Sequence, residues 1–563
     1  MTMTKKKLEN IQLKDVKSWT MVEIRPLSPV EEDLREQDYD MPAVDAPEEL
    51  LPQYVSGASL VLIVLGLCLT IFVIHLDANI IATAIPHITS TFNSLDDIGW
   101  YGSAYLLTST ALQPCFGRLY THFNLKIIYL VALLIFEAGS IICATATNSS
   151  MFIAGRAVAG TGVAALLSGS MSLLAFSIPL EKRPMYIGIV SSMYGISAVV
   201  GPVLGGVLTD RLSWRWCFWI NPPCGALTFF AITYFFQSPH RNSTSSDPPL
   251  WKKLNEIDVL GATLFIGSTI CLLLALQWGG TQYAWGNVKI WGLFLGCFMI
   301  FGVFIIWQRF RRETALLPIK LLTQRSVLAS TAVSLFYSMV LAIYIYYLPI
   351  YFQAVQHTTA ANSAIQILPF ILSLTVTIGV VGFFITMTGE YLHFVWLGAV
   401  MIIVGSGMLS TLKVDSPLSH RFGYQIILGI GAGATAQVPF LVVQIAVRPS
   451  DAPLGLSLIM LANNAGGAVA ISIAQSVFIN ALMKNIRRYA PDVDPHTVIK
   501  GGITELSNAG IEPAILAKIT QAFAQAIRAT FIYPIVFAGL CFTCSLAFER
   551  RNIKGKSVIF ATA

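Results

Sequence analysis

Charged residues are scarce in this chain. They make up 12% of its 563 residues, whereas 55% are hydrophobic and the mean hydropathy is +0.67. A typical soluble domain carries about 25% charged residues. So much apolar surface cannot be buried in a soluble globule, and the repeated apolar runs of about 20 residues have the length of bilayer-spanning helices. The cations behind the net charge of +6 lie mainly between these runs, so we expect a lipid bilayer and no nucleic acid as partner.

The chain also lacks the signatures of several enzyme and pump classes. No phosphate-binding loop with its lysine is present, so no ATP-driven motor is expected. Gly429, Gly431 and Gly433 superficially resemble a nucleotide loop, but they lie in an apolar run with no preceding strand. No Ser-His-Asp or zinc-ligand spacing stands out, and the nine cysteines lie in or beside apolar runs, as small buried hydrophobes do. We therefore expect no catalytic site, no metal and no cofactor.

Fourteen apolar runs follow a polar tail. The tail, residues 1–56, has no apolar core close enough behind its lysines for a cleavable signal peptide, and we expect it to be disordered and cytosolic. The runs lie near 57–82, 98–118, 125–147, 151–178, 185–209, 214–236, 257–278, 290–308, 326–352, 363–388, 392–412, 423–446, 453–480 and 530–548. The sequence thus predicts an all-α integral membrane protein.

Two polar, basic connections divide these runs. The connections at 237–256 and 309–325 separate a six-helix half at 57–236, two inserted helices at 257–308 and a second half at 326–548. A tail at 549–563 follows. An even number of spans places both termini on one side, and the connections on that side hold most of the Lys and Arg residues between spans. Both termini are therefore expected in the cytosol.

The segment 481–529 is expected to be a long outer loop. Within it Pro513 can begin a helix, because proline is well tolerated in a first helical turn. Ile515, Ile519, Phe523 and Ile527 then form one apolar stripe. Such a helix would either lie on the membrane surface or pack as a lid on neighbouring loops.

Three ionisable residues lie deep inside the predicted spans. Asp77, Glu137 and Arg156 fall at similar depth, and burying such a group in a bilayer costs on the order of 3 kcal/mol. A carboxylate–arginine cluster would let a proton neutralise the carboxylate and loosen the pairing, which makes these residues proton-coupling candidates. The alternative is a permanent pair that only fixes helix positions. His75 shares this depth, but it is two residues from Asp77 and we interpret it as a satisfied polar residue.

Small residues mark one face of the run 185–209. Gly195, Ala198, Pro202, Gly205 and Thr209 recur at helical spacing, which favours close packing against another helix. The Gly-Pro break adds the ability to bend, so we predict a helix that moves during function. The residues assigned to this motif are Gly195, Gly201, Pro202, Gly205 and Gly206.

Polar and aromatic residues in other runs could line a cavity for a largely apolar ligand. Ordinary helix packing is the alternative for each of them. The candidates are Gln113, Tyr194, Tyr337, Tyr344, Gln437 and Asn464.

Several stretches resemble the major facilitator superfamily, specifically its fourteen-helix drug:proton antiporters and the fungal toxin efflux pumps among them. Residues 76–86 resemble the first-helix motif of that group, and 155–162 resemble its fourth-helix motif, with Arg156 at the proton-transfer arginine. Residues 195–206 resemble the motif associated with exporters. The resemblance covers nearly all of 57–556 and implies a rocking core of two six-helix halves with two helices inserted between them.

The resemblance also implies an inner gate at Gly117, Arg118 and Lys126. Here the sequence departs from the family pattern, because Thr121 replaces an aspartate and Asn124 replaces a glycine. In the corresponding loop of the second half, Met387 stands where a cation is common, and in the first span Asn79 replaces a threonine.

From these observations we expect proton-coupled export of hydrophobic or amphipathic small molecules, such as toxins, secondary metabolites or drugs, by alternating access. The proton gradient would supply the energy. We expect a monomer in the plasma membrane, with the vacuolar membrane as the alternative. An importer or siderophore carrier of the same fold is the alternative within transport. A non-transporting receptor or scaffold is the alternative from another class, and a membrane enzyme ranks third because no catalytic constellation is present.

Overall fold

The computed structural model describes residues 54–92, 94, 97–237, 258–280, 282–311, 314–491, 493–495, 498 and 513–554. The chain divides into Met1–Gln53 and Tyr54–Ala563, and all described residues belong to the second unit. The expectations for nearly all of the tail 1–56 and the connection 237–256 therefore lie outside the described residues. The same holds for parts of 309–325, 481–529 and 549–563.

The described residues form helices and no strand. In chain order the helices are α2 (Gly57–Phe92), α3 (Ile98–His122), α4 (Leu125–Thr145), α5 (Ser149–Ser177), α6 (Arg183–Arg211), α7 (Trp216–Trp219), α8 (Asn221–Phe235), α10 (Val259–Trp278), α11 (Val288–Arg311), α12 (Ile319–Leu322), α13 (Arg325–Ala354), α14 (Ala360–Thr388), α15 (Leu392–Leu409), α16 (Leu418–Ala436), α17 (Val438–Ala446), α18 (Ala452–Tyr489), α20 (Pro513–Thr530) and α21 (Tyr533–Ser545).

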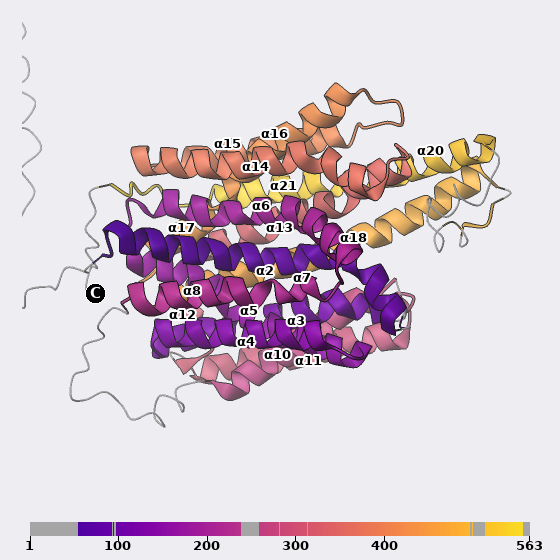
Figure 1. Ribbon diagram of the computed structural model, residues 1–563. Coiled ribbons are helices and arrows are strands. Elements are labelled where there is room, and N and C mark those ends of the chain that lie inside the picture. The colour runs from indigo at the N-terminus through magenta and orange to yellow at the C-terminus, as the bar shows by residue number, and fades with distance from the viewer. Residues whose placement is uncertain are drawn as a thin grey trace, which may run out of the picture. The chain divides into compact units, whose positions relative to one another are not determined.

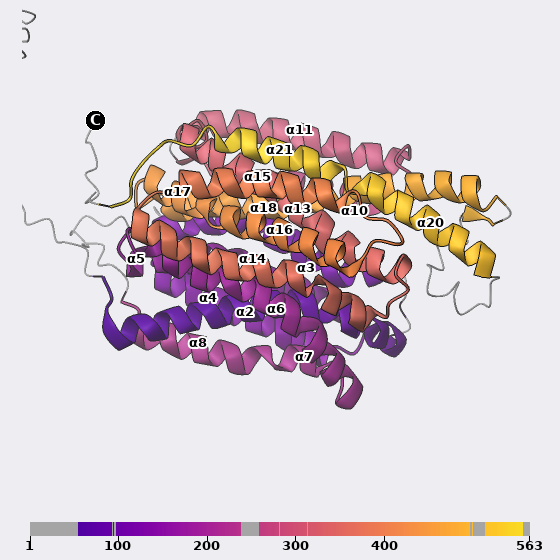
Figure 2. The same ribbon diagram turned by 90° about the horizontal axis from the view of Figure 1, so that it is seen from above.

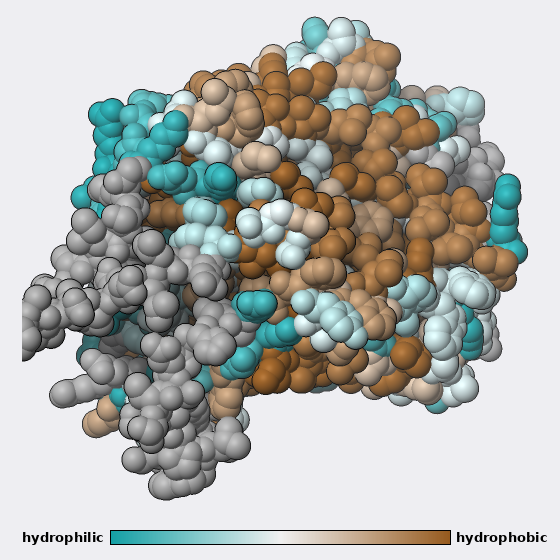
Figure 3. Space-filling view, turned by 60° about the vertical axis from the view of Figure 1, so that its left-hand side comes forward, coloured by the Kyte–Doolittle hydropathy of each residue, from teal (hydrophilic) through white to brown (hydrophobic). Residues whose placement is uncertain are grey.

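Twelve helical segments among the described residues are long and apolar enough to cross a membrane, which confirms the all-α membrane fold. Helix also occupies the two remaining expected ranges, but α3 is not among the twelve, and α8 has only 15 residues. The 6+2+6 division therefore stays a prediction. The surface agrees with membrane burial, because apolar side chains cover the middle of the face in Figure 3 and polar ones gather toward its ends.

The long helices of this unit lie side by side with their axes close to parallel (Figures 1 and 2). In both views α2 to α8 gather on one side, and α14 to α16 with α21 gather on the other. We call the end of the bundle where α2 begins the near end, and the opposite end the far end. Successive long helices alternate in direction, so α4, α6 and α18 also begin at the near end.

Prolines and polar caps account for the helix boundaries. Asn124 and Asn148 accept hydrogen bonds from the first free backbone N–H groups of α4 and α5, which otherwise have no partner in a helix. Pro439 follows the break between α16 and α17 at Gln437, and prolines at the start of α8 separate it from α7. α14 ends at Thr388 and is capped by Gly389, whose φ of 77° is a left-handed conformation that glycine adopts readily.

The two helices between the halves form a pair on one flank. α11 packs against α10, and α10 packs in turn against α3 and α18. Asp258, immediately before α10, is 1% exposed and holds the near end of this pair together. It accepts hydrogen bonds from the backbone of Gly261 and Leu316 and from the side chains of Trp307 and Gln308. One carboxylate thus joins α10, α11 and the segment after α11.

The described parts of 481–529 are mostly helical. α18 continues to Tyr489, and α20 begins at Pro513 as expected. The apolar stripe of α20 faces protein, because Ile519, Phe523 and Ile527 are at most 5% exposed and α20 packs against α18 and α13. The structure therefore favours packing onto helices over lying on the membrane surface, because the stripe covers apolar side chains of α13 and α18.

Candidate functional site

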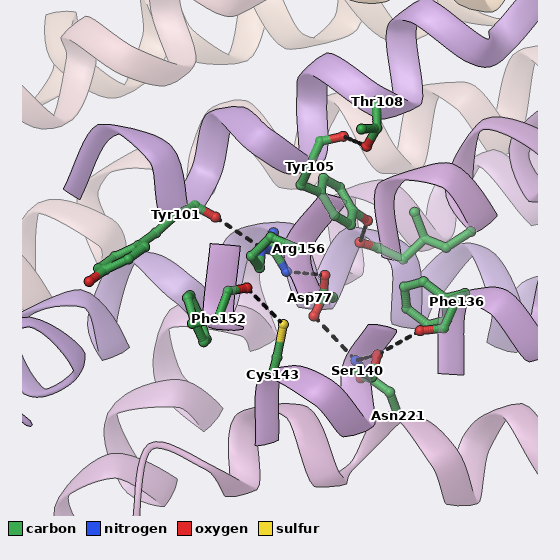
Figure 4. Close-up of polar contacts among 11 residues, drawn as sticks. Asp77, Tyr101, Tyr105, Thr108, Phe136, Ser140, Cys143, Phe152, Arg156 and Asn221 are labelled. Carbon is green, nitrogen blue, oxygen red and sulfur yellow. Dashed lines mark hydrogen bonds and ion pairs between the residues drawn. The ribbon is translucent and has the colours of Figure 1, made fainter. Parts of the chain in front are cut away.

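A buried ion pair lies in the first half of the bundle. Arg156 of α5 donates from Nη1 to Oδ2 of Asp77 on α2 over 2.6 Å, and both side chains are 1% exposed. The pair therefore bridges two helices in a region without solvent. Removing one partner of such a pair leaves an uncompensated buried charge, which costs about 3–5 kcal/mol. Figure 4 shows the two side chains pointing toward each other between their helices.

The guanidinium of Arg156 has further partners on α3 and α7. Its Nε donates to the backbone carbonyl of Tyr101 over 3.0 Å. Its Cζ lies 4.3 Å from the centre of the Tyr105 ring and 5.9 Å from that of Phe218. A desolvated cation gains about 2 kcal/mol from such ring faces. These contacts hold the arginine in place independently of Asp77.

A residue that the sequence analysis did not single out completes the site. Asn221, the first residue of α8, is fully buried and donates from Nδ2 to Oδ1 of Asp77 (3.2 Å) and to Oγ of Ser140 (3.0 Å). The second carboxylate oxygen of Asp77 is thereby also satisfied (Figure 4). An asparagine inside an apolar run, followed by two prolines that start a helix, was the available signal.

Glycines bring the surrounding helices close enough to exclude water. A Cβ at Gly160 would lie 2.3 Å from the Tyr105 carbonyl oxygen, and one at Gly139 would lie 2.3 Å from the Ala159 nitrogen. Contacts this short leave no room for a side chain at either position. The small residues around Arg156 in α5 thus enclose the charge pair against α3 and α4.

Glu137 does not join the pair. It lies on α4 one turn before Ser140 and is 8% exposed, but neither carboxyl oxygen has a hydrogen-bond partner within the described part of the chain. Arg156 is paired with Asp77 instead. The structure thus brings together two of the three proton-coupling candidates and leaves the third in separate surroundings.

The glycines of the predicted moving helix contact two different helices. A Cβ at Gly195 would lie 1.8 Å from Oγ1 of Thr375 on α14, in the second half. At Gly201 and Gly205, by contrast, a Cβ would meet Asn79 at 2.8 Å and Thr83 at 2.3 Å on α2. Pro202 lies within α6 and is half-buried, and a Cβ at Gly206 would meet nothing within 4 Å. The small residues therefore do not form one contact face.

The gate candidates also separate. A Cβ at Gly117 would lie 2.2 Å from Oγ of Ser457 on α18, so α3 and the second half touch closely at the near end. Arg118 beside it is buried. Lys126, however, donates from Nζ to the carbonyls of Thr233 and Phe236 and so ties α4 to α8 within the first half. Neither of these hydrogen bonds reaches the second half.

The aromatic cavity candidates are buried or half-buried, but their surroundings differ. Tyr194 makes an edge contact with His75 at 4.8 Å between ring centres, and Tyr337 is 6% exposed. Tyr344 is fully buried in the second half and packs against Phe531, as a residue of the hydrophobic core does.

The amide candidates are similarly divided. Gln113 is fully buried, and its amide atoms have no hydrogen-bond partner within the described ranges. Gln437 donates to the Ile378 carbonyl of α14 and lies beside Gly188 of α6. Asn464 is half-buried on α18. Among the described residues, no group of three or more His, Cys, Asp or Glu side chains comes together as a metal site would require.

This chain matches a known protein family. Residues 67–471 match the Major Facilitator Superfamily. The chain is 41% identical over 512 residues to an MFS-type efflux pump, MFS1, of Arthroderma benhamiae, covering 91% of this chain and 95% of that protein. It is 40% identical over 516 residues to the efflux pump roqT of Penicillium rubens, with the same coverage.

A solved structure shares the fold. The human organic anion transporter MFSD10 superposes with a TM-score of 0.55 at 12% identity, over 86% of this chain and all of that one. The family match spans most of the helical bundle, and the fungal relatives align over nearly the full length. This chain therefore belongs to the Major Facilitator Superfamily and is an integral membrane transporter rather than an enzyme.

Proposed function

We propose that this chain exports hydrophobic or amphipathic small molecules in exchange for protons. The observation that carries the proposal is the enclosed Asp77–Arg156 pair, whose side chains are each 1% exposed. A charge pair in the membrane interior is costly and is retained where it has a role in transport. The names of the relatives, which include several efflux pumps, support the outward direction.

A proton on Asp77 would change the contacts between helices. The neutral carboxyl loses its charge attraction to Arg156, while the arginine keeps the Tyr101 carbonyl and the Tyr105 ring. α5 and α3 then stay joined, and α2 loses its charged link to α5 but keeps the hydrogen bond from Tyr105 of α3 to its Ile74 carbonyl. Since α2 also packs against α6 through Gly201 and Gly205, a shift of α2 that follows the loss of this link reaches the helix that contacts the second half.

The two halves contact each other at the near end, as expected of a transporter that opens alternately to the two sides of the membrane. Arg183 donates to Gln444 over 3.4 Å, and the Met185 N–H donates to Thr386 over 3.1 Å. Gly117 of α3 also packs closely against Ser457 of α18 at this end, so these three contacts hold the two halves together there. Breaking them would open a path from the near side to the middle of the bundle, as rocking of two halves requires.

The middle of the bundle offers aromatic rings with few charges. Tyr194, Tyr337 and His75, with Gln113, suit a largely apolar ligand that carries hydrogen-bonding groups. We place toxins, secondary metabolites and drugs in this class. We also propose the plasma membrane as the location, with cytosolic termini at the near end and the proton gradient as the energy source.

Oriented proteoliposomes test this proposal. With an imposed proton gradient, the wild-type protein should move an amphipathic dye toward the side facing the far end and carry protons in the opposite direction. Asp77→Asn and Arg156→Ala should each lower this flux by about tenfold or more, the usual size of a coupling between sites. Glu390→Gln is the matched control, because this carboxylate is 37% exposed and pairs with His393 and Arg550 away from the Asp77–Arg156 pair. Gradient-dependent flux that survives both variants would refute the pair's role, and net inward movement would support an importer.

A further inference from the structure

Glu137 faces a small cavity that is separate from the charge pair. The cavity lies between α2, α4 and α8 and has a volume of about 10 Å³, enough for roughly one water molecule. Its lining is apolar apart from the carboxyl of Glu137, the hydroxyls of Thr70 and Thr228 and the Cys224 thiol. A Cβ at Gly225 would lie 2.0 Å from the carboxyl oxygen Oε1, so the glycine makes the space that the carboxyl occupies.

The surroundings of Glu137 suit a carboxylic acid better than a carboxylate. An ionised carboxylate at 8% exposure needs a cation or several donors, and neither oxygen has a partner among the described residues. The titratable groups on the facing helices offer no help. Arg156 of α5 is held by Asp77 of α2, whose own negative charge opposes a second one, and Cys224 of α8 is a neutral thiol.

The cavity is connected to the charge pair by one helical turn on each of two helices. Glu137 and Ser140 are three residues apart on α4, and Gly225 and Asn221 are four apart on α8. Asn221 hydrogen-bonds both Ser140 and Asp77. Any shift of α8 that follows a change at Asp77 therefore also changes the space around Glu137.

We propose that Glu137 is a second proton-binding site, which takes up and releases one proton in each transport cycle. The proposal rests on proton-coupled export as proposed above. In the present conformation Glu137 is a neutral acid. When α8 moves, the O–H bond breaks, the proton passes to a water molecule in the cavity, and a carboxylate remains. Thr70 lies seven residues before Asp77 and about 10 Å nearer the near end. Its hydroxyl donates to the hydroxyl of Thr228, so these two groups lie on that side of the cavity.

Glu137→Gln tests this proposal, because the amide copies the neutral acid and cannot release a proton. We expect proton-driven accumulation to fall by about tenfold or more. The number of protons moved per substrate, measured from the reversal of flux, should drop by one. Substrate exchange without a gradient should persist, which also shows that the variant folds. Glu390→Gln should match the wild type.

The outcomes separate the two proposals. If the wild-type protein moves substrate without protons, proton-coupled export fails and this inference fails with it. If Asp77→Asn abolishes coupling while Glu137→Gln keeps the wild-type stoichiometry, only the role of Glu137 is overturned.

A measurement on the wild-type chain does not depend on a variant that folds. Dicyclohexylcarbodiimide modifies protonated carboxyls in apolar surroundings, and peptide mass spectrometry should locate the label on Glu137. Labelling should fall as the pH rises, because fewer molecules carry the proton. A reagent of this size can enter only when the cavity of about 10 Å³ opens, so the reaction is run during transport. A Glu137 that stays unlabelled at low pH while substrate is moving would contradict the proposal.

Discussion

Each residue of the charge site has a different role. The three residues are Asp77, Arg156 and Asn221. The carboxylate supplies a charge that a proton can remove, and the guanidinium supplies a cation with donors in several directions. The amide satisfies the remaining oxygen without adding charge. An arginine held by α3 and a carboxylate on α2 can separate without leaving the arginine free of contacts.

Asn221→Ala should weaken the site without breaking the ion pair. The change removes two hydrogen bonds, to Asp77 and to Ser140, and leaves a buried carboxylate oxygen without its donor. We expect a loss of about 1–3 kcal/mol in the free energy of unfolding. Proton-driven efflux should also fall.

Thermal unfolding in detergent and transport in vesicles measure the two effects. Asn552→Ala, at the near end outside this cluster, is the comparison. An Asn221→Ala protein with wild-type stability and flux would show that the bridge has no function.

The inserted pair of helices depends on a single carboxylate. Burial opposes the charge on Asp258, but hydrogen bonds from Trp307, Gly261, Gln308 and Leu316 outweigh that effect and lower the pKa of its carboxyl. A lowered pKa means that the folded state favours the ionised form. The stabilisation is therefore present above the ordinary aspartate pKa of about 4 and is lost as the pH falls through the lowered value.

Asp258→Asn should consequently destabilise the protein at neutral pH by on the order of 3 kcal/mol. The side-chain amide of the variant would place an N–H donor against the N–H groups that now donate to the carboxylate. The difference between wild type and variant should shrink as the pH falls below about 4. Thermal unfolding across pH measures it, with the exposed Asp415→Asn as the control. A difference that stays constant down to the lowest pH would argue against an ionised Asp258.

The two halves meet through close contacts at the near end, and these contacts must open if the halves rock. Met185 of α6 and Thr386 of α14 are joined by a hydrogen bond of 3.1 Å. Gly117 and Ser457 touch at a second point. The same helices therefore contact each other at the near end and would have to part there.

A cross-link at this contact should stop transport. In the double variant Met185→Cys with Thr386→Cys, a short bis-methanethiosulfonate reagent forms a disulfide with each thiol and releases methanesulfinate. The resulting cross-link should join α6 to α14 and reduce efflux by about tenfold or more. Reduction of the cross-link should restore the flux. The two single variants, treated alike in the same cysteine background, are the controls. Full efflux from a quantitatively cross-linked protein would exclude opening at this end.

The apolar runs were sufficient to predict helix in all fourteen ranges, and twelve of the described helical segments are long and apolar enough to span a bilayer, which leaves backbone groups no partner outside the helix. The depth of Asp77 and Arg156 follows from their distance along each helix, so their meeting could also be anticipated. The burial of the apolar stripe of α20 could not, since one stripe suits a membrane surface and a protein surface equally.

What the local pattern could not provide was the choice of partner. Helical spacing suggested one face for Gly195 and Gly205, yet the first packs on α14 and the second on α2. Similar depth grouped Glu137 with Asp77 and Arg156, but the rotation of α4 directs its carboxyl toward Gly225. Sequence specifies how far along a helix a residue lies and how apolar its neighbours are. Only the packing of helices against one another decides which side chains touch, because that depends on the rotation and separation of several helices at once.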